Sequence, residues 1–108
     1  MTRATHVYVS SAEDGEISRY VLEPSGALKA MAPVKVAKGV MPMAVSPDQR
    51  FLYVVSRPPP YAIHVLAIDR DTGALTPASA SPIPESLLYI SFDRSGRFLL
   101  GASYHTSL

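Results

Sequence analysis

The chain has 108 residues, of which 47% are hydrophobic, and it carries a net charge of +1 at pH 7. This length suits one small domain, and the absence of cysteine excludes disulfide bonds, thiolate metal sites and a cysteine nucleophile. No basic run is present, so the charge gives no argument for a nucleic-acid partner. No apolar run approaches the roughly 20 residues of a membrane span, and the N-terminus lacks the apolar core of a secretion signal. A soluble, cytoplasmic protein is therefore expected.

Taken in chain order, short runs of β-branched and aromatic residues predict strands, and no stretch has convincing helical periodicity. An Asp-Gly pair in Glu13–Glu16 predicts a hairpin turn whose central residues have positive φ. The runs 28–36 and 75–82 contain prolines and predict weak strands at a sheet edge, because proline cannot donate to a ladder. The strands expected are 5–11, 17–22, 28–36, 43–45, 51–56, 61–68 and 75–82, with a further repeat from Leu88.

The stretch Pro42–Ser56 contains the clearest strand–turn–strand unit of the chain. Its turn is Ser46–Gln49, because proline presets φ at about −65° and the Ser and Asp side chains bond nearby backbone amides. The following run, Phe51–Val55, is apolar at every position, which favours a strand buried on both faces. The same burial is expected for Ala62–Ile68.

Three landmarks recur at nearly one spacing and indicate an internal repeat. Two pairs lie 47 residues apart and one pair lies 45 residues apart. The pairs are Arg50–Leu52 with Arg97–Leu99, Gly26–Leu28 with Gly73–Leu75, and Val7–Val9 with Leu52–Val54. Repeats of roughly 40 to 50 residues made of short strands are typical of β-propeller blades. The predicted fold class is therefore all-β, a propeller of four-stranded antiparallel blades.

At these residues the chain resembles a known family. The runs Pro42–Pro58, Asp71–Thr76 and Asp93–Tyr104 are similar to the bacterial 6-phosphogluconolactonase of the seven-bladed β-propeller type, and the resemblance extends from Val7 to Tyr104. It implies that a small-molecule sugar lactone, 6-phosphoglucono-δ-lactone, is hydrolysed to 6-phosphogluconate in the pentose phosphate pathway. It implies no cofactor. Related propellers act on other lactones or run lactonising reactions.

The repeat also predicts how much of a propeller the chain holds. Blade 1 would span about residues 5–36, blade 2 about 41–82, and a third blade would start within 87–108. Because nothing ahead of Thr5 can serve as an inner strand, the chain would enter blade 1 at its second strand. A seven-bladed ring needs roughly three times this length. We therefore expect an N-terminal fragment or a truncated reading frame, whose exposed blade faces would allow self-association.

Two residues are candidates for the chemistry that the resemblance implies. Arg57 follows a strand end, on the face expected to carry the linkers between blades, and its planar donors would anchor the substrate phosphate. The alternative is a solvated arginine held by the three prolines after it. His105 lies in the corresponding loop of the next repeat and would be the general base that activates water, or else a polar residue near a frayed end. Tyr89 stands where relatives often carry a histidine, so no base carries over there.

The remaining histidines and the recurring charges have structural interpretations. His64 is expected to be packed mid-strand with a backbone partner, His6 to be structural, and the histidines show no metal-ligand spacing. Charged residues that recur with the repeat indicate turn capping, because a single active site does not need a residue in every blade. These residues are Asp48, Asp93, Arg50 and Arg97.

Two functions from different classes stay open. In the first, the chain belongs to a lactone hydrolase and is inactive as an isolated fragment. In the second, it is a non-catalytic propeller fragment or an interaction scaffold, and a repeat scaffold of another family is a further option. Size-exclusion chromatography of the purified chain discriminates between the two, because a well-folded, self-closed oligomer keeps an enzyme possible and soluble aggregate supports a broken gene product. A scaffold of another family would show no lactonase activity even when completed.

Overall fold

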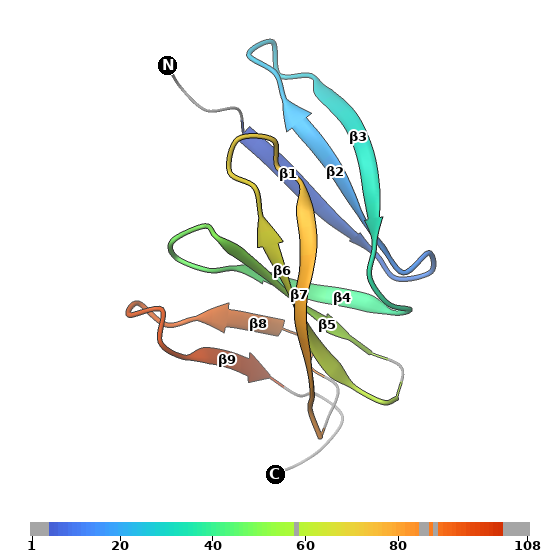
Figure 1. Ribbon diagram of the computed structural model, residues 1–108, viewed down its shortest axis with the longest axis vertical. Helices are drawn as coiled ribbons and strands as arrows, with labels where there is room; N and C mark the ends of the chain where they lie inside the picture. Colours follow the sequence, from blue (N-terminus) through green and yellow to red (C-terminus); the bar gives the residue numbers. More distant parts are fainter. Residues whose placement is uncertain (1–4, 58, 85–86, 88, 103–108) are drawn as a thin grey trace.

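The computed structural model describes residues 5–57, 59–84, 87 and 89–102. Within these residues the chain forms nine strands and no helix, which confirms the all-β expectation. Figure 1 shows three antiparallel sheets that follow one another from the N-terminal end, in blue, to the C-terminal end, in red. The strands are β1 (Thr5–Ser11), β2 (Glu16–Leu22), β3 (Leu28–Lys35), β4 (Val40–Val45), β5 (Phe51–Ser56), β6 (Ala62–Ile68), β7 (Leu75–Pro82), β8 (Tyr89–Phe92) and β9 (Leu99–Ala102).

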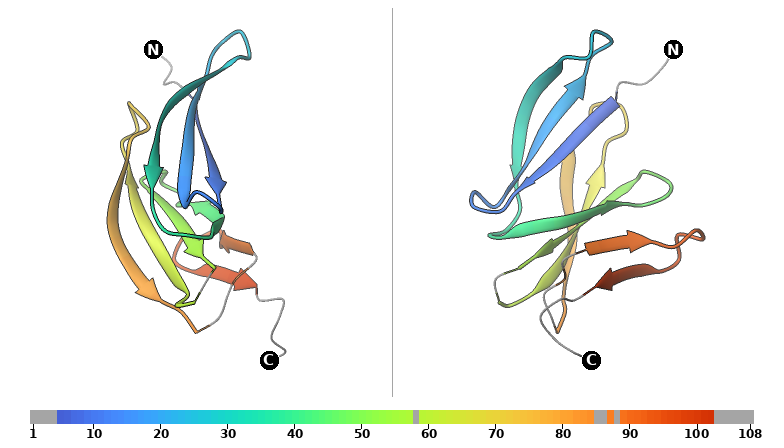
Figure 2. Two further views of the ribbon diagram at one scale, coloured as in Figure 1. Left: turned by 90° about the vertical axis from the view of Figure 1, so that its right-hand side faces the viewer. Right: turned by 180° about the vertical axis from the view of Figure 1, so that it is seen from behind.

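In each sheet the strands lie in the order of the chain: β1-β2-β3, then β4-β5-β6-β7, then β8-β9. The two views of Figure 2 show the four-stranded sheet between the other two. Tyr8 of β1 pairs with Arg19, and Tyr53 of β5 pairs with Val65, so β1 is the counterpart of β5. The described part of the first sheet therefore has no counterpart of β4. The blade limits of 5–36, 41–82 and 87–108 stay a prediction.

The outer strands β3 and β7 lie at sheet edges, as their prolines predict. Both are largely exposed, and in β7 only Leu75 is buried. The pairing of β7 with β6 shifts between Val65 and Leu66, and that of β3 with β2 shifts between Ile17 and Arg19. Such irregularities, together with proline, blunt an edge that could otherwise pair with another chain.

Side chains of the turn itself fix the connection between β4 and β5, as predicted. The Ser46 carbonyl accepts a hydrogen bond from the Gln49 amide at 2.8 Å. Ser46 Oγ accepts from the Phe51 amide at 3.0 Å and donates to Asp48 Oδ1 at 2.6 Å. The same carboxylate accepts from the Arg50 amide at 3.1 Å. The Ser46 hydroxyl and then this amide lower the pKa of the Asp48 carboxyl below its ordinary value.

The turn between β8 and β9 contains the same network with the two side chains exchanged. Asp93 Oδ1 accepts from the Phe98 amide at 3.2 Å, and Ser95 Oγ donates to Asp93 Oδ2 at 2.7 Å. Asp93 thus occupies the position of Ser46, and Ser95 that of Asp48. Turn capping is confirmed for both aspartates, although they stand at different turn positions.

The Asp-Gly turn between β1 and β2 differs from its prediction. Gly15 has a φ of 68°, whereas Asp14 is not among the described residues with positive φ. The Gly15 amide donates to the Ser11 carbonyl at 3.0 Å, which closes a loop longer than the two-residue hairpin that needs two such residues.

The strand β4 begins earlier than predicted. It starts at Val40, three residues before the strand 43–45 that the sequence predicts, so Met41 and Pro42 belong to it. Pairing with β5 is irregular between Val40 and Met43, and this irregularity accommodates a proline without a broken ladder bond.

The core lies between the first and second sheets. Both faces of β5 are covered, as predicted, since Leu52, Val54 and Val55 are buried. In β6 only Leu66 is buried, so the expectation of complete burial for that strand was wrong. The two-stranded third sheet is too narrow to cover a strand that lies third in its own sheet. The core cluster comprises Ile17, Val40, Leu52, Val54, Leu66 and Leu75.

The third sheet packs on the inner half of the second sheet. Tyr53 and Phe92 meet edge to face, with ring centroids 5.0 Å apart and planes at 80°, and Ile90 is buried. On the outward side Tyr89 is 66% exposed and Leu100 is 60% exposed. The described residues therefore leave an apolar sheet face uncovered. No helix in the described part of the chain is long and apolar enough to cross a membrane.

Candidate functional site

The predicted phosphate anchor, Arg57, lies directly after β5, beside the linker between the first two sheets. Its amide donates to the Gly39 carbonyl at 3.0 Å, so Arg57 does lie on the linker face, as predicted. The guanidinium Nη1 approaches Met41 Sδ at 3.4 Å. Ser10 Oγ donates to the Met41 carbonyl at 2.8 Å and ties the end of β1 to the same place. The partly exposed Arg57 side chain therefore lies where the end of β1, the start of β4 and the end of β5 meet.

Ser56, the residue before Arg57 in the chain, forms a pair with His64. Ser56 Oγ is 3.1 Å from His64 Nε2 and 3.4 Å from the Ala62 carbonyl. The register explains the pair: Val54 opposes His64 and Ser56 opposes Ala62, so the two side chains are diagonal neighbours on one face. His64 therefore has a side-chain partner in place of the backbone partner that was expected. Burial lowers the pKa of the His64 imidazole below its ordinary value of 6.5.

A hydroxyl beside a neutral imidazole is the arrangement of an activated nucleophile. Ser56 is only 5% exposed, however, so a lactone carbonyl has no approach to its oxygen. The pair is best explained as a tie between β5 and β6. The sequence alone does not reveal it, because the two residues are eight apart and only the hairpin register brings them together.

Of the other two residues singled out for the site, one is outside the described part of the chain and one lies in the third sheet. His105 lies outside the described residues, so its role as a base stays a prediction. Tyr89 begins β8 and is largely exposed on the uncovered face of the third sheet. In the described ranges no group of three His, Cys, Asp or Glu side chains could hold a metal ion.

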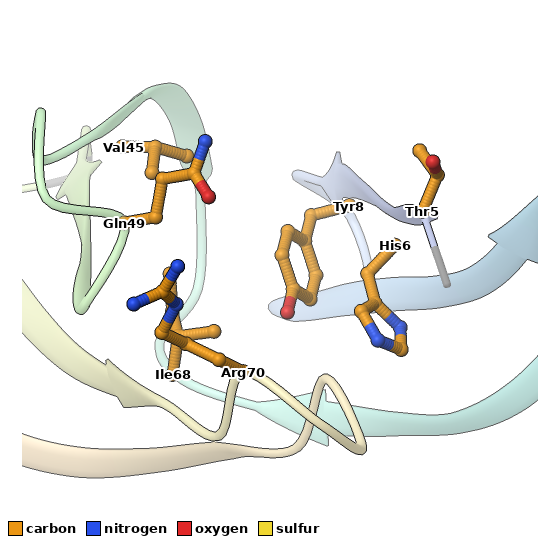
Figure 3. A pocket seen from close by; sticks show the side chains of 7 residues that line it. All are labelled: Thr5, His6, Tyr8, Val45, Gln49, Ile68 and Arg70. Atoms are coloured by element: carbon orange, nitrogen blue, oxygen red, sulfur yellow. The ribbon is translucent and has the colours of Figure 1, made fainter. Parts of the chain in front are cut away.

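A separate pocket of about 460 Å³ opens at the opposite ends of the same strands. Figure 3 shows Gln49 and Arg70 on one side of it and Tyr8 and His6 on the other. Gln49 lies before the first residue of β5, and Arg57 follows its last residue. The length of the strand, at about 3.3 Å per residue, therefore puts roughly 20 Å between these two residues. Figure 1 agrees, because the β4–β5 turn and the far end of β5 lie on opposite sides of the molecule.

Tyr8 and His6, which line one side of this pocket, contact the turn between β6 and β7. Tyr8 O–H donates to the Gly73 carbonyl at 2.8 Å, and burial raises the pKa of the Tyr8 hydroxyl. The His6 ring packs so closely on Gly73 that no side chain fits there. His6 Nε2 is buried and bonds to no described residue. Arg19 Nη2 donates to the Thr72 carbonyl at 3.3 Å. The side chains of Tyr8, His6 and Arg19, all from the first sheet, therefore contact the turn between β6 and β7.

Comparison with known proteins identifies the kind of propeller to which these sheets belong. Residues 6–108 match the family model described as lactonase, 7-bladed beta-propeller. The chain belongs to this family. The propeller fold class is thereby confirmed, and the antiparallel sheets are its blades, of which the chain holds only part.

The relatives are much longer than this chain. A 6-phosphogluconolactonase of Enterobacter sp. (strain 638) is 43% identical over 99 residues, which are 92% of this chain and 30% of that protein. A 6-phosphogluconolactonase of Yersinia pestis (strain Pestoides F) is 44% identical over 98 residues, 91% of this chain and 29% of that protein. The chain thus spans about a third of the length of these lactonases.

Solved structures agree on the fold. A periplasmic gluconolactonase from Pseudomonas aeruginosa superposes with a TM-score of 0.81 at 22% identity, over 90% of this chain and 29% of that one. At this identity the likeness establishes the propeller architecture alone.

Proposed function

We propose that this chain is the segment of a lactone hydrolase that contributes one side of a phosphate-binding channel mouth, with 6-phosphoglucono-δ-lactone as substrate. The observation that supports it most is the identity of 43–44% with proteins named 6-phosphogluconolactonase across almost the whole chain. A cytoplasmic location and a place in the pentose phosphate pathway belong to the same proposal.

In this proposal the described residues bind and orient the substrate. Arg57 contacts the substrate phosphate, because a guanidinium offers paired, permanently charged donors to phosphate oxygens. Its backbone bond to Gly39 fixes the start of the side chain beside the linker between the first two sheets.

The reaction itself needs a base. Water adds to the lactone carbonyl while the base accepts its proton, the ring C–O bond then breaks, and the ring oxygen receives a proton, which gives the open-chain acid. We propose His105 for this base. Replacing His105 with Gln would remove the base and lower kcat with little change in KM.

A chimera tests the function without relying on the isolated chain. This segment would replace the matching third of the Enterobacter lactonase, and the chimera would be assayed with phosphorylated and unphosphorylated gluconolactone against the spontaneous rates. We expect catalysis that favours the phosphorylated lactone. A folded chimera with neither activity, while the parent enzyme is active, would contradict the proposal.

An interaction scaffold is the second candidate, and the uncovered apolar face of the third sheet favours it. Tyr89, Phe98 and Leu100 are each at least 60% exposed, and such a patch marks a contact surface. Self-association through this face predicts oligomers of the 108-residue chain in light scattering, which Leu100→Ser would reduce. A monomeric wild-type chain would remove this candidate.

A further inference from the structure

The pocket of Figure 3 lies at the end of the blades opposite Arg57 and takes no part in the proposed lactone site. We propose that it is a second binding site, for the phosphate or carboxylate group of a small organic anion, with Arg70 and Gln49 as the principal donors. Two departures from the internal repeat converge on this one cavity.

The first departure is Gln49. It adopts a φ of 60°, a left-handed conformation that costs an ordinary residue free energy, and it is the sole non-glycine residue with positive φ in the described part of the chain. Its counterpart 47 residues later is Gly96, whose φ is 72° and which fits the same turn without strain. Backbone strain that the repeat itself shows to be avoidable points to a role for the side chain.

The second departure is the turn between β6 and β7. In the first sheet the corresponding turn closes with a bond from the Glu23 amide to the Ala27 carbonyl, at 2.8 Å. In the second sheet the bond joins the Asp69 amide and the Ala74 carbonyl, at 2.9 Å, which encloses one residue more. The longer turn carries Arg70 to the rim of the pocket.

The chemistry of the lining favours an oxyanion. Arg70, Gln49 and Thr5 bring donors, and no acidic side chain lines the pocket within the described residues. The Arg70 guanidinium forms no hydrogen bond or ion pair in that same part of the chain. The nearby Asp69 turns one carboxylate oxygen into its own turn, where it accepts the amides of Asp71 and Thr72 at 2.9 and 3.1 Å. Charge-assisted bonds from a guanidinium are the strong contacts of phosphate and carboxylate sites.

The test is a titration of the 108-residue chain with inorganic phosphate, and in parallel with acetate, followed by NMR of the Gln49 side-chain amide and the Arg70 backbone amide. We expect saturable shifts with a dissociation constant near the millimolar range. The ion with the lower dissociation constant identifies the group, phosphate or carboxylate, that the site prefers. Arg70→Gln should weaken binding by about tenfold or more, since a charge-assisted contact is lost.

Two further variants separate this site from the lactone site and from a structural role. Arg57→Gln should leave the titration unchanged, because Arg57 lies at the other end of β5. Gln49→Gly should weaken binding while raising thermal stability, a combination that a purely structural glutamine cannot give. Absence of saturable shifts in a folded chain, or shifts that Arg57→Gln abolishes and Arg70→Gln does not, would overturn the proposal.

Discussion

Among the described residues, Gln49 is the one residue other than glycine whose backbone has a positive φ. The left-handed conformation costs an L-residue about 1–2 kcal/mol, while glycine loses about 0.5–1 kcal/mol through greater freedom in the unfolded chain. The strain at Gln49 therefore costs more than the added freedom of a glycine, and Gly96 shows that glycine fits this turn.

We therefore expect Gln49→Gly to raise the free energy of unfolding by about 0.5 kcal/mol. Urea denaturation of the two proteins measures this difference. Gln49→Ala is the matched control, because it removes the side chain and keeps the strain. A glycine variant that is less stable than the alanine variant would show that φ is not the source of the cost.

His64 makes the stability of the chain depend on pH. Burial lowers its folded-state pKa below 6.5, so the unfolded chain binds more protons than the folded chain in the window just below 6.5. Stability then rises with pH through that window and is lost as the pH falls from 7.

The expected result is a loss of stability below pH 6.5 that His64→Gln reduces, since glutamine keeps a donor for Ser56 and does not titrate. Thermal unfolding of both proteins between pH 5 and pH 8 measures the effect. Identical pH profiles for the two proteins would exclude His64 as the cause.

At the scale of elements, the hairpin turns are the parts that local sequence specifies best. Ser46 is buried and bonds both the Phe51 amide and the Asp48 carboxylate. Its place in the turn was predictable, because Ser, Pro and Asp act on backbone within a few residues of themselves.

Ser46→Ala should lower the free energy of unfolding by about 1 kcal/mol, since the Phe51 amide loses its acceptor. Chemical denaturation measures the loss. Ser79→Ala on the exposed outer strand β7 is the control and should change stability little. Equal effects of the two substitutions would show that the turn network contributes nothing specific.

The limits of local prediction are also visible at this scale. The edge strands β3 and β7 could be predicted from their prolines, and β5 from its unbroken apolar run. The partial exposure of β6 could not, because it depends on how far a neighbouring sheet extends. The Ser56–His64 pair and the pocket around Tyr8 likewise depend on register and on contacts 65 residues apart in sequence.

For the whole molecule, the repeat spacing was sufficient to predict the propeller, since each blade reuses the same landmarks. The position of Arg57 beside Gly39 also followed from blade topology. The residues that would act together with Arg57 could not be predicted in this way. A channel mouth of a propeller draws on several blades, and this chain spans about a third of the length of its relatives.

The central claim is that Arg57 binds the substrate phosphate, and one kinetic comparison in the Enterobacter chimera tests it most directly. Arg57→Ala should raise KM for 6-phosphoglucono-δ-lactone by about tenfold or more and leave KM for unphosphorylated gluconolactone unchanged. Arg50→Ala, at the opposite end of β5, is the control for general damage. An unchanged KM for the phosphorylated lactone, or an equal rise for both lactones, would contradict the claim.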